Sequence, residues 1–169
     1  MTAPDVIWFL GSDSDLPHVE GGFKQLRDLG ISFEVRILSA HRTPDQVGQV
    51  ASGAREAGTK VLIGVAGGAA HLAGVLASMT TLPVIAVPIP TEFAGGLDSL
   101  LSMVQMPSGI PVATVAANKA GGKNAALLAA RIMSVSDGAV AARLDEHKQG
   151  MAEAVLAKDK KVRSKYASN

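Results

Sequence analysis

The amino-acid sequence predicts an α/β fold with a five-stranded parallel sheet covered by helices on both faces. Two observations carry this prediction: five short apolar runs recur along the 169 residues, and a helical pattern follows each run. A run that is apolar throughout is typical of a strand buried on both faces, and regular alternation of strands with helices indicates a parallel sheet. No repeat or linker divides the chain, so we expect one domain over residues 1–169, with a charged helical extension from about residue 137.

The expected strands span residues 6–10, 31–38, 60–65, 83–87 and 111–116. The expected helices span residues 16–29, 43–57, 98–104 and 118–135, and a further helix ends at Met79. Asp15 and Thr43 are expected to cap the first two helices, because each is followed by a proline that suits the first turn. Gly30 and Gly58 are expected to end these helices.

Composition excludes several classes of function. The formal net charge is only +1, aromatic residues make up 4% of the chain, and no basic stripe is present, so we expect neither a nucleic-acid nor a membrane partner. There is no cysteine, which excludes disulfides, thiolate metal sites and a cysteine nucleophile. The first residues lack the pattern of a secretory signal, and no apolar run is long enough to span a bilayer, so we expect a cytoplasmic protein.

The stretch S-A-H-R-T-P-D at residues 39–45 joins the second expected strand to its helix. In α/β folds this kind of turn carries the chemistry. Ser39, His41 and Arg42 offer a hydroxyl, an imidazole and a guanidinium within four residues, next to Ala40. Taken alone, the stretch is equally compatible with an ordinary polar loop.

Two other loops follow expected strands at the same edge of the sheet. The first contains Ser12, Ser14 and Asp15 directly before a helix, where free N–H groups favour an anion. The second, A-G-G-A-A-H-L at residues 66–72, has consecutive small residues before His71, so a ligand could lie directly on its backbone. Each loop alone is compatible with plain turn chemistry, but parallel strands bring all three to one edge.

Together these loops suit a small phosphorylated ribosyl compound. Arg42 with neighbouring hydroxyls suits a phosphate, and the carboxylate of Asp15 suits ribose hydroxyls. The small-residue wall at residues 67–70 suits a planar or uncharged group. An imidazole can carry a proton in either direction near neutral pH. No carboxylate cluster accompanies His41 and His71, so we expect acid–base chemistry without a metal or cofactor.

At these residues the chain resembles the bacterial 5-(carboxyamino)imidazole ribonucleotide mutases of purine biosynthesis, the class I form of their family. The resemblance covers nearly the whole chain. Its motifs are G-S-D-S-D at residues 11–15, S-A-H-R-T-P-D at residues 39–45, A-G-G-A-A-H-L at residues 66–72, D-S-L-L-S-M-V-Q-M-P at residues 98–107 and K-N-A-A-L-L-A-A from Lys123.

The resemblance implies a flavodoxin-like three-layer domain, a homo-octamer, and a nucleotide substrate whose N-carboxylate leaves as carbon dioxide and is added to the imidazole ring carbon. It implies that His41 transfers the proton and that no cofactor or metal takes part. The residues expected to bind substrate are Ser12, Ser14, Asp15, Ser39, Ala40, Arg42, Gly67, Gly68, Ala69 and His71, and the last lies in the loop that matches the family's carbon dioxide pocket.

The chain departs from the family pattern at three places. Leu16 stands where a tryptophan is common, Ala73 replaces the proline of H-L-P-G, and the long irregular stretch at residues 88–96 contains F-A-G, which is similar to class II members. Those members carboxylate aminoimidazole ribonucleotide directly, so direct carboxylation is the alternative reaction, although the intact G-G-A-A-H-L loop favours class I.

A non-catalytic flavodoxin-like module is the alternative from another class of protein. A signalling receiver would need an aspartate at the end of the third strand, where V-A-G stands at residues 65–67. A flavin carrier should absorb visible light when purified.

Overall fold

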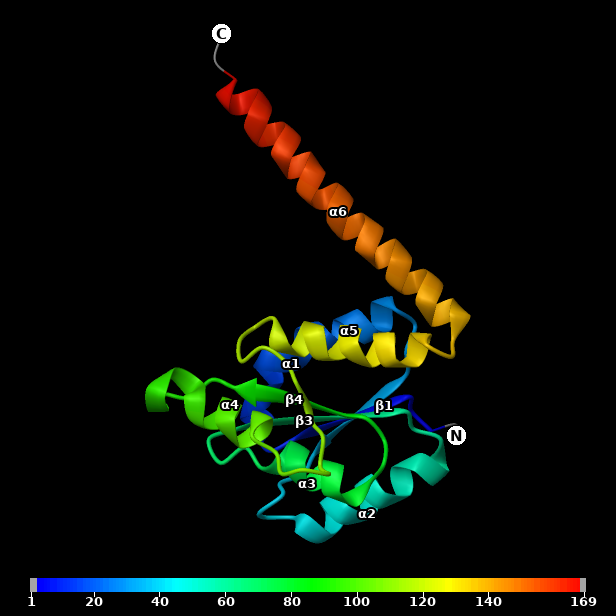
Figure 1. Ribbon diagram of the computed structural model, residues 1–169, viewed down its shortest axis with the longest axis vertical. Coiled ribbons are helices and arrows are strands. Elements are labelled where there is room, and N and C mark those ends of the chain that lie inside the picture. The colour runs from blue at the N-terminus through cyan, green and yellow to red at the C-terminus, as the bar shows by residue number, and fades with distance from the viewer. Residues whose placement is uncertain (1–2, 168–169) are drawn as a thin grey trace. The chain divides into compact units, whose positions relative to one another are not determined.

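The computed structural model describes residues 3–167, which form two compact units, one up to Ala129 and one from Ala130 onward. Figure 1 shows the elements in chain order. The strands are β1 (Val6–Leu10), β2 (Phe33–Ile37), β3 (Val61–Gly67), β4 (Val84–Ile89) and β5 (Ala113–Thr114). The helices are α1 (Leu16–Asp28), α2 (Pro44–Ala57), α3 (Leu72–Met79), α4 (Leu97–Val104), α5 (Gly121–Ser134) and α6 (Gly138–Tyr166), with short 3-10 turns η1 (Asp13–Asp15) and η2 (Phe93–Gly96).

The five strands form one parallel sheet in the order β2-β1-β3-β4-β5, which confirms the predicted fold class. Leu10 at the end of β1 is level with Ile37 of β2 and Val65 of β3. The strand order reverses between β1 and β3, and such a reversal opens a crevice at the carboxyl ends of the strands. The topology therefore places the predicted loops around one crevice.

Four of the five strands differ from their expected bounds, and only β1 matches them. β2 is shorter than expected by two residues at its start and one at its end. β3 and β4 each end two residues later than predicted. Ala66 pairs with Pro88 and Gly67 pairs with Ile89, although alanine, glycine and proline are poor strand formers. The last strand is much shorter than expected: β5 contains only Ala113 and Thr114, which pair at the edge of the sheet. A run of apolar residues does not show how many of its residues form backbone hydrogen bonds with a neighbouring strand, so it does not fix the length of the strand.

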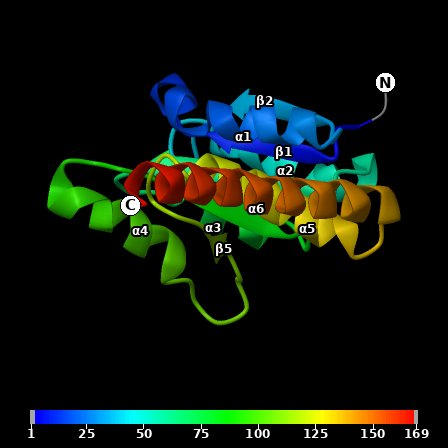
Figure 2. The ribbon, with the colours of Figure 1, turned by 90° about the horizontal axis from the view of Figure 1, so that it is seen from above.

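Helices cover both faces of the sheet, as the alternating buried side chains of β1 require. Ile7 and Phe9 belong to the core shared with α2, α3 and α4. Trp8 points to the opposite face, where its ring meets Phe23 of α1 edge-on at 5.1 Å between centroids. Phe23 also stacks on Phe33 of β2 at 5.6 Å, and Figure 2 shows α1 lying along β1 and β2.

Close approach of α3 to the sheet depends on one glycine. A Cβ atom at Gly64 in the middle of β3 would lie 2.9 Å from both the Cα and the Cβ of Ala73. Real Cβ atoms essentially never come so close to a backbone atom. The pair Gly64 and Ala73 therefore sets the distance between β3 and the helix that leaves the 66–72 loop.

The helix ends lie within three residues of their predicted positions, but the predicted capping hydrogen bonds are not all present. Gly58 ends α2 with a left-handed φ of 104°, as expected, and Gly30 follows α1 with a φ of 63°. The predicted side-chain caps are wrong: neither Asp15 on α1 nor Thr43 on α2 makes a capping hydrogen bond. The side chain of Asp15 instead bonds to the backbone of Ser12, and that of Thr43 to the backbone of Ser39.

The segment from Gly138 to Tyr166 forms one helix, α6, which agrees with the predicted C-terminal helical extension. Asp137 caps it by accepting the N–H groups of Ala139 and Val140 at 3.0 and 3.1 Å. Between residues 3 and 167, no helix is both long and apolar enough to cross a membrane.

Candidate active site

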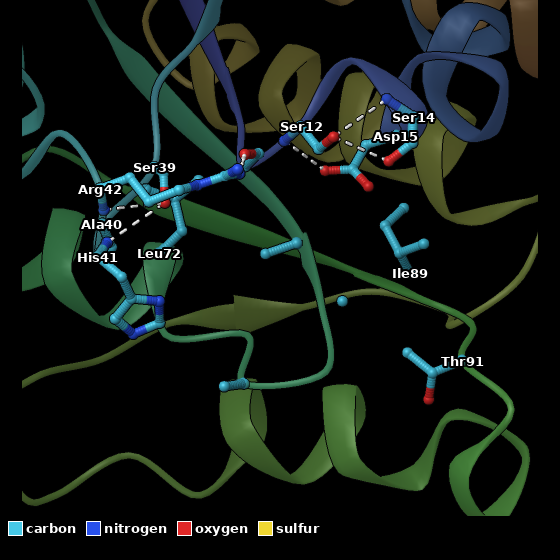
Figure 3. A pocket seen from close by; sticks show the side chains of 14 residues that line it. Ser12, Ser14, Asp15, Ser39, Ala40, His41, Arg42, Leu72, Ile89 and Thr91 are labelled. Atoms are coloured by element: carbon cyan, nitrogen blue, oxygen red, sulfur yellow. Dashed lines mark hydrogen bonds between the residues drawn. The ribbon is translucent and has the colours of Figure 1, made fainter.

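A pocket of about 510 Å³ opens at the carboxyl ends of β1, β2, β3 and β4 (Figure 3). It lies at the predicted edge of the sheet. Its lining residues are Gly11, Ser12, Ser14, Asp15, Ser39, Ala40, His41, Arg42, Ala66, Gly67, Ala69, Leu72, Ile89 and Thr91. Nine of the eleven predicted site residues are among them; the two that are not, Gly68 and His71, lie in the loop that forms one wall.

The loop after β1 is held by a reciprocal pair of hydrogen bonds. The N–H of Ser12 donates to Oδ2 of Asp15 at 3.1 Å, and the hydroxyl of Ser12 accepts the N–H of Ser14 at 3.3 Å. The hydroxyl of Ser14 also donates to that of Ser12 at 2.9 Å. This arrangement closes η1 and explains why the Asp15 carboxylate does not cap α1.

Asp15 is the buried carboxylate of the pocket, with only 7% of its surface exposed. Burial raises the pKa of this carboxyl above its ordinary value, and the hydrogen bond from the Ser12 N–H opposes that rise. A desolvated acceptor at a pocket wall suits hydroxyl groups of a ligand, which would supply the hydrogen bonds that water cannot.

The turn after β2 is organised around Ser39. Its hydroxyl accepts the N–H groups of His41 and Arg42 at 3.4 and 3.2 Å. The hydroxyl of Thr43 donates to the carbonyl of Ser39 at 3.1 Å and accepts the Ser39 N–H at 2.9 Å, so it closes this turn instead of capping α2. One serine therefore fixes the backbone of both His41 and Arg42.

Arg42 links the turn after β2 to the loop after β1. Its guanidinium donates a 2.9 Å hydrogen bond to the carbonyl of Gly11. A guanidinium carries five N–H donors in a planar fork, so further donors remain for a ligand at the pocket. Figure 3 shows Arg42, Ser39 and His41 on one side of the pocket and Ser12, Ser14 and Asp15 on the other.

The two predicted histidines are in direct contact. Nε2 of His41 lies 2.9 Å from Nδ1 of His71, and their rings meet edge-on with 5.0 Å between centroids. In such a pair one ring nitrogen must donate and the other must accept, so the contact restricts the tautomers of both rings. His71 thus touches the predicted proton-transfer residue although it does not itself line the pocket.

Five lining residues were not among the predicted ones: Gly11, Ala66, Leu72, Ile89 and Thr91. Ile89 ends β4 and Thr91 follows it, and both fall within the stretch at residues 88–96 that was expected to be irregular. Long loops often bind ligands, but the length of this stretch does not point to particular residues. The other three stand at the ends of the motifs at residues 11–15 and 66–72, and none of them has a polar side chain that would mark it as a ligand contact.

The arrangement supports acid–base chemistry on a small anionic compound. Hydroxyls, a guanidinium, a buried carboxylate and an imidazole pair surround a pocket of suitable size. Within the described part of the chain, no group of three or more His, Cys, Asp or Glu side chains gathers where a metal ion could bind. The expectation that no cofactor takes part stays a prediction.

Comparison with known proteins assigns the family. The profile described as AIR carboxylase matches residues 5–154. The N5-carboxyaminoimidazole ribonucleotide mutase of Brucella melitensis is 52% identical over 151 residues, which cover 89% of this chain and 93% of the relative. The enzyme of the same name from Thermotoga maritima is 49% identical over 159 residues, covering 94% and 92%.

A solved structure agrees with this result. The crystal structure of Treponema denticola PurE superposes with a TM-score of 0.86 at 34% identity and covers 94% of this chain and 98% of its own. The flavodoxin-like expectation therefore agrees with both the strand order and this neighbour. The chain belongs to the AIR carboxylase family.

Proposed function

We propose that this protein is an isomerase that converts 5-carboxyaminoimidazole ribonucleotide to 4-carboxy-5-aminoimidazole ribonucleotide in purine biosynthesis. The relatives that share about half of its sequence over nearly its whole length carry the name of this mutase. One structural observation carries the proposal: a single hydroxyl, that of Ser39, fixes the backbone of both His41 and Arg42. A proton-transfer group is thereby held beside an anion-binding group.

Arg42 and the serines of the pocket hold the phosphate in this proposal, and Asp15 accepts hydrogen bonds from the ribose. The guanidinium suits a phosphate because it offers paired charge-assisted hydrogen bonds. The opposite placement of Arg42 and Asp15 in Figure 3 suits the two ends of a ribose phosphate. The small residues Gly67 and Ala69 leave room for the imidazole and for carbon dioxide.

The chemical steps follow from the substrate. The bond between the exocyclic nitrogen and its carboxylate breaks, carbon dioxide leaves, and the nitrogen takes a proton from His41. The ring carbon then attacks the retained carbon dioxide and forms the new carbon–carbon bond. His41 removes the proton from that carbon and is returned to its starting state. One imidazole can perform both transfers because it gains and loses a proton near neutral pH.

An isotope experiment tests this proposal against direct carboxylation. The purified protein is given the N-carboxylated nucleotide in buffer containing ¹³C-bicarbonate, and the 4-carboxylated product is analysed by mass spectrometry. A mutase that retains its carbon dioxide yields unlabelled product at early times. Labelled product, or product formed efficiently only from the decarboxylated nucleotide and bicarbonate, would instead establish direct carboxylation. Absence of product in both assays would refute the proposed enzyme.

We also propose a homo-oligomer, as the resemblance implies an octamer. The alanines at positions 125, 126, 129 and 130 are buried within the single chain, so they do not themselves require a partner. The support from this chain is α6, where Met151, Val155 and Tyr166 are each about half exposed or more. Light scattering at micromolar concentration should give a mass well above 17.3 kDa; an active monomer would contradict this proposal. The cytoplasmic location stays a prediction.

A further inference from the structure

Ser99 in the first turn of α4 is a buried polar side chain that lies outside the pocket lining. None of its surface is exposed. A hydroxyl removed from water is costly unless it is hydrogen-bonded. Its Oγ accepts the N–H of Gly68 at 2.9 Å, across 31 positions of sequence. A helix that contributes no residue to the pocket wall is therefore bonded to the loop that forms part of it.

The backbone hydrogen bonds inside the loop that donates this bond are local. Gly68 has a left-handed φ of 67°. The next two hydrogen bonds are short three-residue turns: the Ala70 N–H donates to the Gly68 carbonyl at 2.8 Å, and the His71 N–H donates to the Ala69 carbonyl at 2.8 Å. Such turns are local and bend the chain sharply. The bond to Ser99 ties this run of turns to a helix.

The same turns end at His71, whose ring reaches His41. His71 occupies the N-cap position of α3 but makes no side-chain capping bond. Its Nδ1 lies instead 2.9 Å from Nε2 of His41. A displaced Gly68 would carry Ala69 and His71 with it, because His71 follows Gly68 by only three positions in the chain.

We propose that Ser99 is a positioning residue of this active site: by holding the N–H of Gly68, it fixes the 68–71 turn and thereby keeps His71 against His41. Ser99 touches neither the pocket nor the two imidazoles. It acts on the reaction only through the 68–71 turn, whose last residue contacts His41. The kinetic part of this inference rests on the proposed mutase activity, whereas the placement of the two imidazoles does not.

Ser102 provides a matched control on the same helix. Its hydroxyl donates a 2.7 Å bond to the carbonyl of Asp98 within α4, and its contact to the Gly68 carbonyl is long, at 3.4 Å. Ser102→Ala removes the same atom as Ser99→Ala, from a position one turn further along α4. It should leave the 68–71 turn in place.

The placement is tested by NMR on protein labelled at Cε1 of histidine in a deuterated background. The chain has four histidines, so four imidazole signals are expected. Ser99→Ala should shift the signals of His41 and His71 and leave those of His18 and His147 in place. Ser102→Ala should leave all four where they are in the natural protein, and Ser99→Thr, which keeps the hydroxyl, should restore the natural positions.

The kinetic arm uses the same variants. Ser99→Ala should lower kcat by about 10- to 100-fold, the size of loss that a misplaced catalytic group causes, while KM changes by less than about threefold. Ser102→Ala should retain kcat within about threefold. If Ser99→Ala does not fold, Ser99→Cys replaces it, because a thiol fills the site but accepts the Gly68 N–H only weakly. The imidazole signals of His41 and His71 in that variant then test the placement.

Natural signals for His41 and His71 in Ser99→Ala would overturn the inference, whatever the value of kcat. Equal effects of Ser99→Ala and Ser102→Ala would also overturn it, because they would indicate general damage to α4. If the natural protein forms no product, the proposed function fails, and the NMR result still decides whether Ser99 places the two imidazoles.

Discussion

The guanidinium of Arg42 donates a 2.9 Å hydrogen bond to the carbonyl of Gly11, and this bond joins the loop after β2 to the loop after β1. The two strands are neighbours in the sheet, so their carboxyl ends meet at the crevice. Arg42 therefore has two roles in the proposed site. Its bond to Gly11 holds the loops after β1 and β2 together, and its remaining N–H groups can bind an anion.

Arg42→Lys should weaken substrate binding more than it slows the bound chemistry. A lysine keeps the positive charge but lacks the planar guanidinium with its several N–H donors. It therefore cannot donate to the Gly11 carbonyl and bind a phosphate at the same time in the same geometry. KM should rise by about tenfold or more, the loss expected for one charge-assisted hydrogen bond, with kcat changed little. Steady-state kinetics measures both constants. A large fall in kcat at unchanged KM would assign Arg42 to the chemistry.

His41→Asn should lower turnover by about 100- to 10,000-fold, because general acid–base catalysis contributes that much and asparagine cannot transfer the proton. The variant should stay folded and should still bind the nucleotide, which calorimetry can measure.

His71→Asn is the matched variant for the other ring of the pair, and we expect it to lose less turnover than His41→Asn, because His71 does not line the pocket. An inactive His71→Asn beside a largely active His41→Asn would reverse the two roles.

Much of the fold could be predicted because it depends on patterns local in sequence. Strands β1, β3 and β4 are short apolar runs buried along nearly their whole length, and Gly58 ends α2 through a conformation that glycine adopts easily. The ends of β3 and β4 were missed because pairing, not composition, decides how far a strand continues. For these strand ends, prediction failed because the outcome depends on a partner strand from elsewhere in the chain.

The site shows the same division. The three motifs supplied most of its residues, since each motif follows a strand and parallel strands bring their ends together. The contact of His41 with His71 spans 30 positions and that of Ser99 with Gly68 spans 31, and neither leaves a local pattern. The expected caps by Asp15 and Thr43 were wrong for another reason: two local patterns compete for the same side chain, and the preceding turn takes it instead of the helix.

Gly64→Ala should destabilise the fold by about 1–3 kcal/mol, the usual effect of overpacking a core. The added Cβ would lie 2.9 Å from the Cα of Ala73, which is backbone and cannot move aside easily. Gly53→Ala is the control: Gly53 lies inside α2, and a Cβ added there would have nothing within 4 Å, so alanine should stabilise the protein by about 0.5–1 kcal/mol. Urea unfolding at fixed protein concentration measures both, and equal effects would contradict the close packing of α3.

Asp15→Asn should increase stability at neutral pH while weakening nucleotide binding. Burial raises the pKa of this carboxyl above the ordinary value of 3.8, so the folded protein keeps the proton to a higher pH than the unfolded chain does. As the pH rises between these two pKa values, the unfolded chain binds fewer protons than the folded protein, and the free energy of unfolding decreases. Below pH 3.8 this decrease is absent, and above the raised pKa it is complete.

Asparagine carries no charge at any pH and its carbonyl oxygen can still accept the Ser12 N–H, so Asp15→Asn should escape this loss. Urea unfolding of both proteins across pH 3 to 8 should show a stability difference that grows in favour of the variant as the pH rises. Asp15→Ala, which removes the acceptor as well as the charge, should gain less, because the Ser12 N–H loses its partner. A variant Asp15→Asn that becomes less stable relative to the natural protein at higher pH would show that the folded state favours the charged carboxylate.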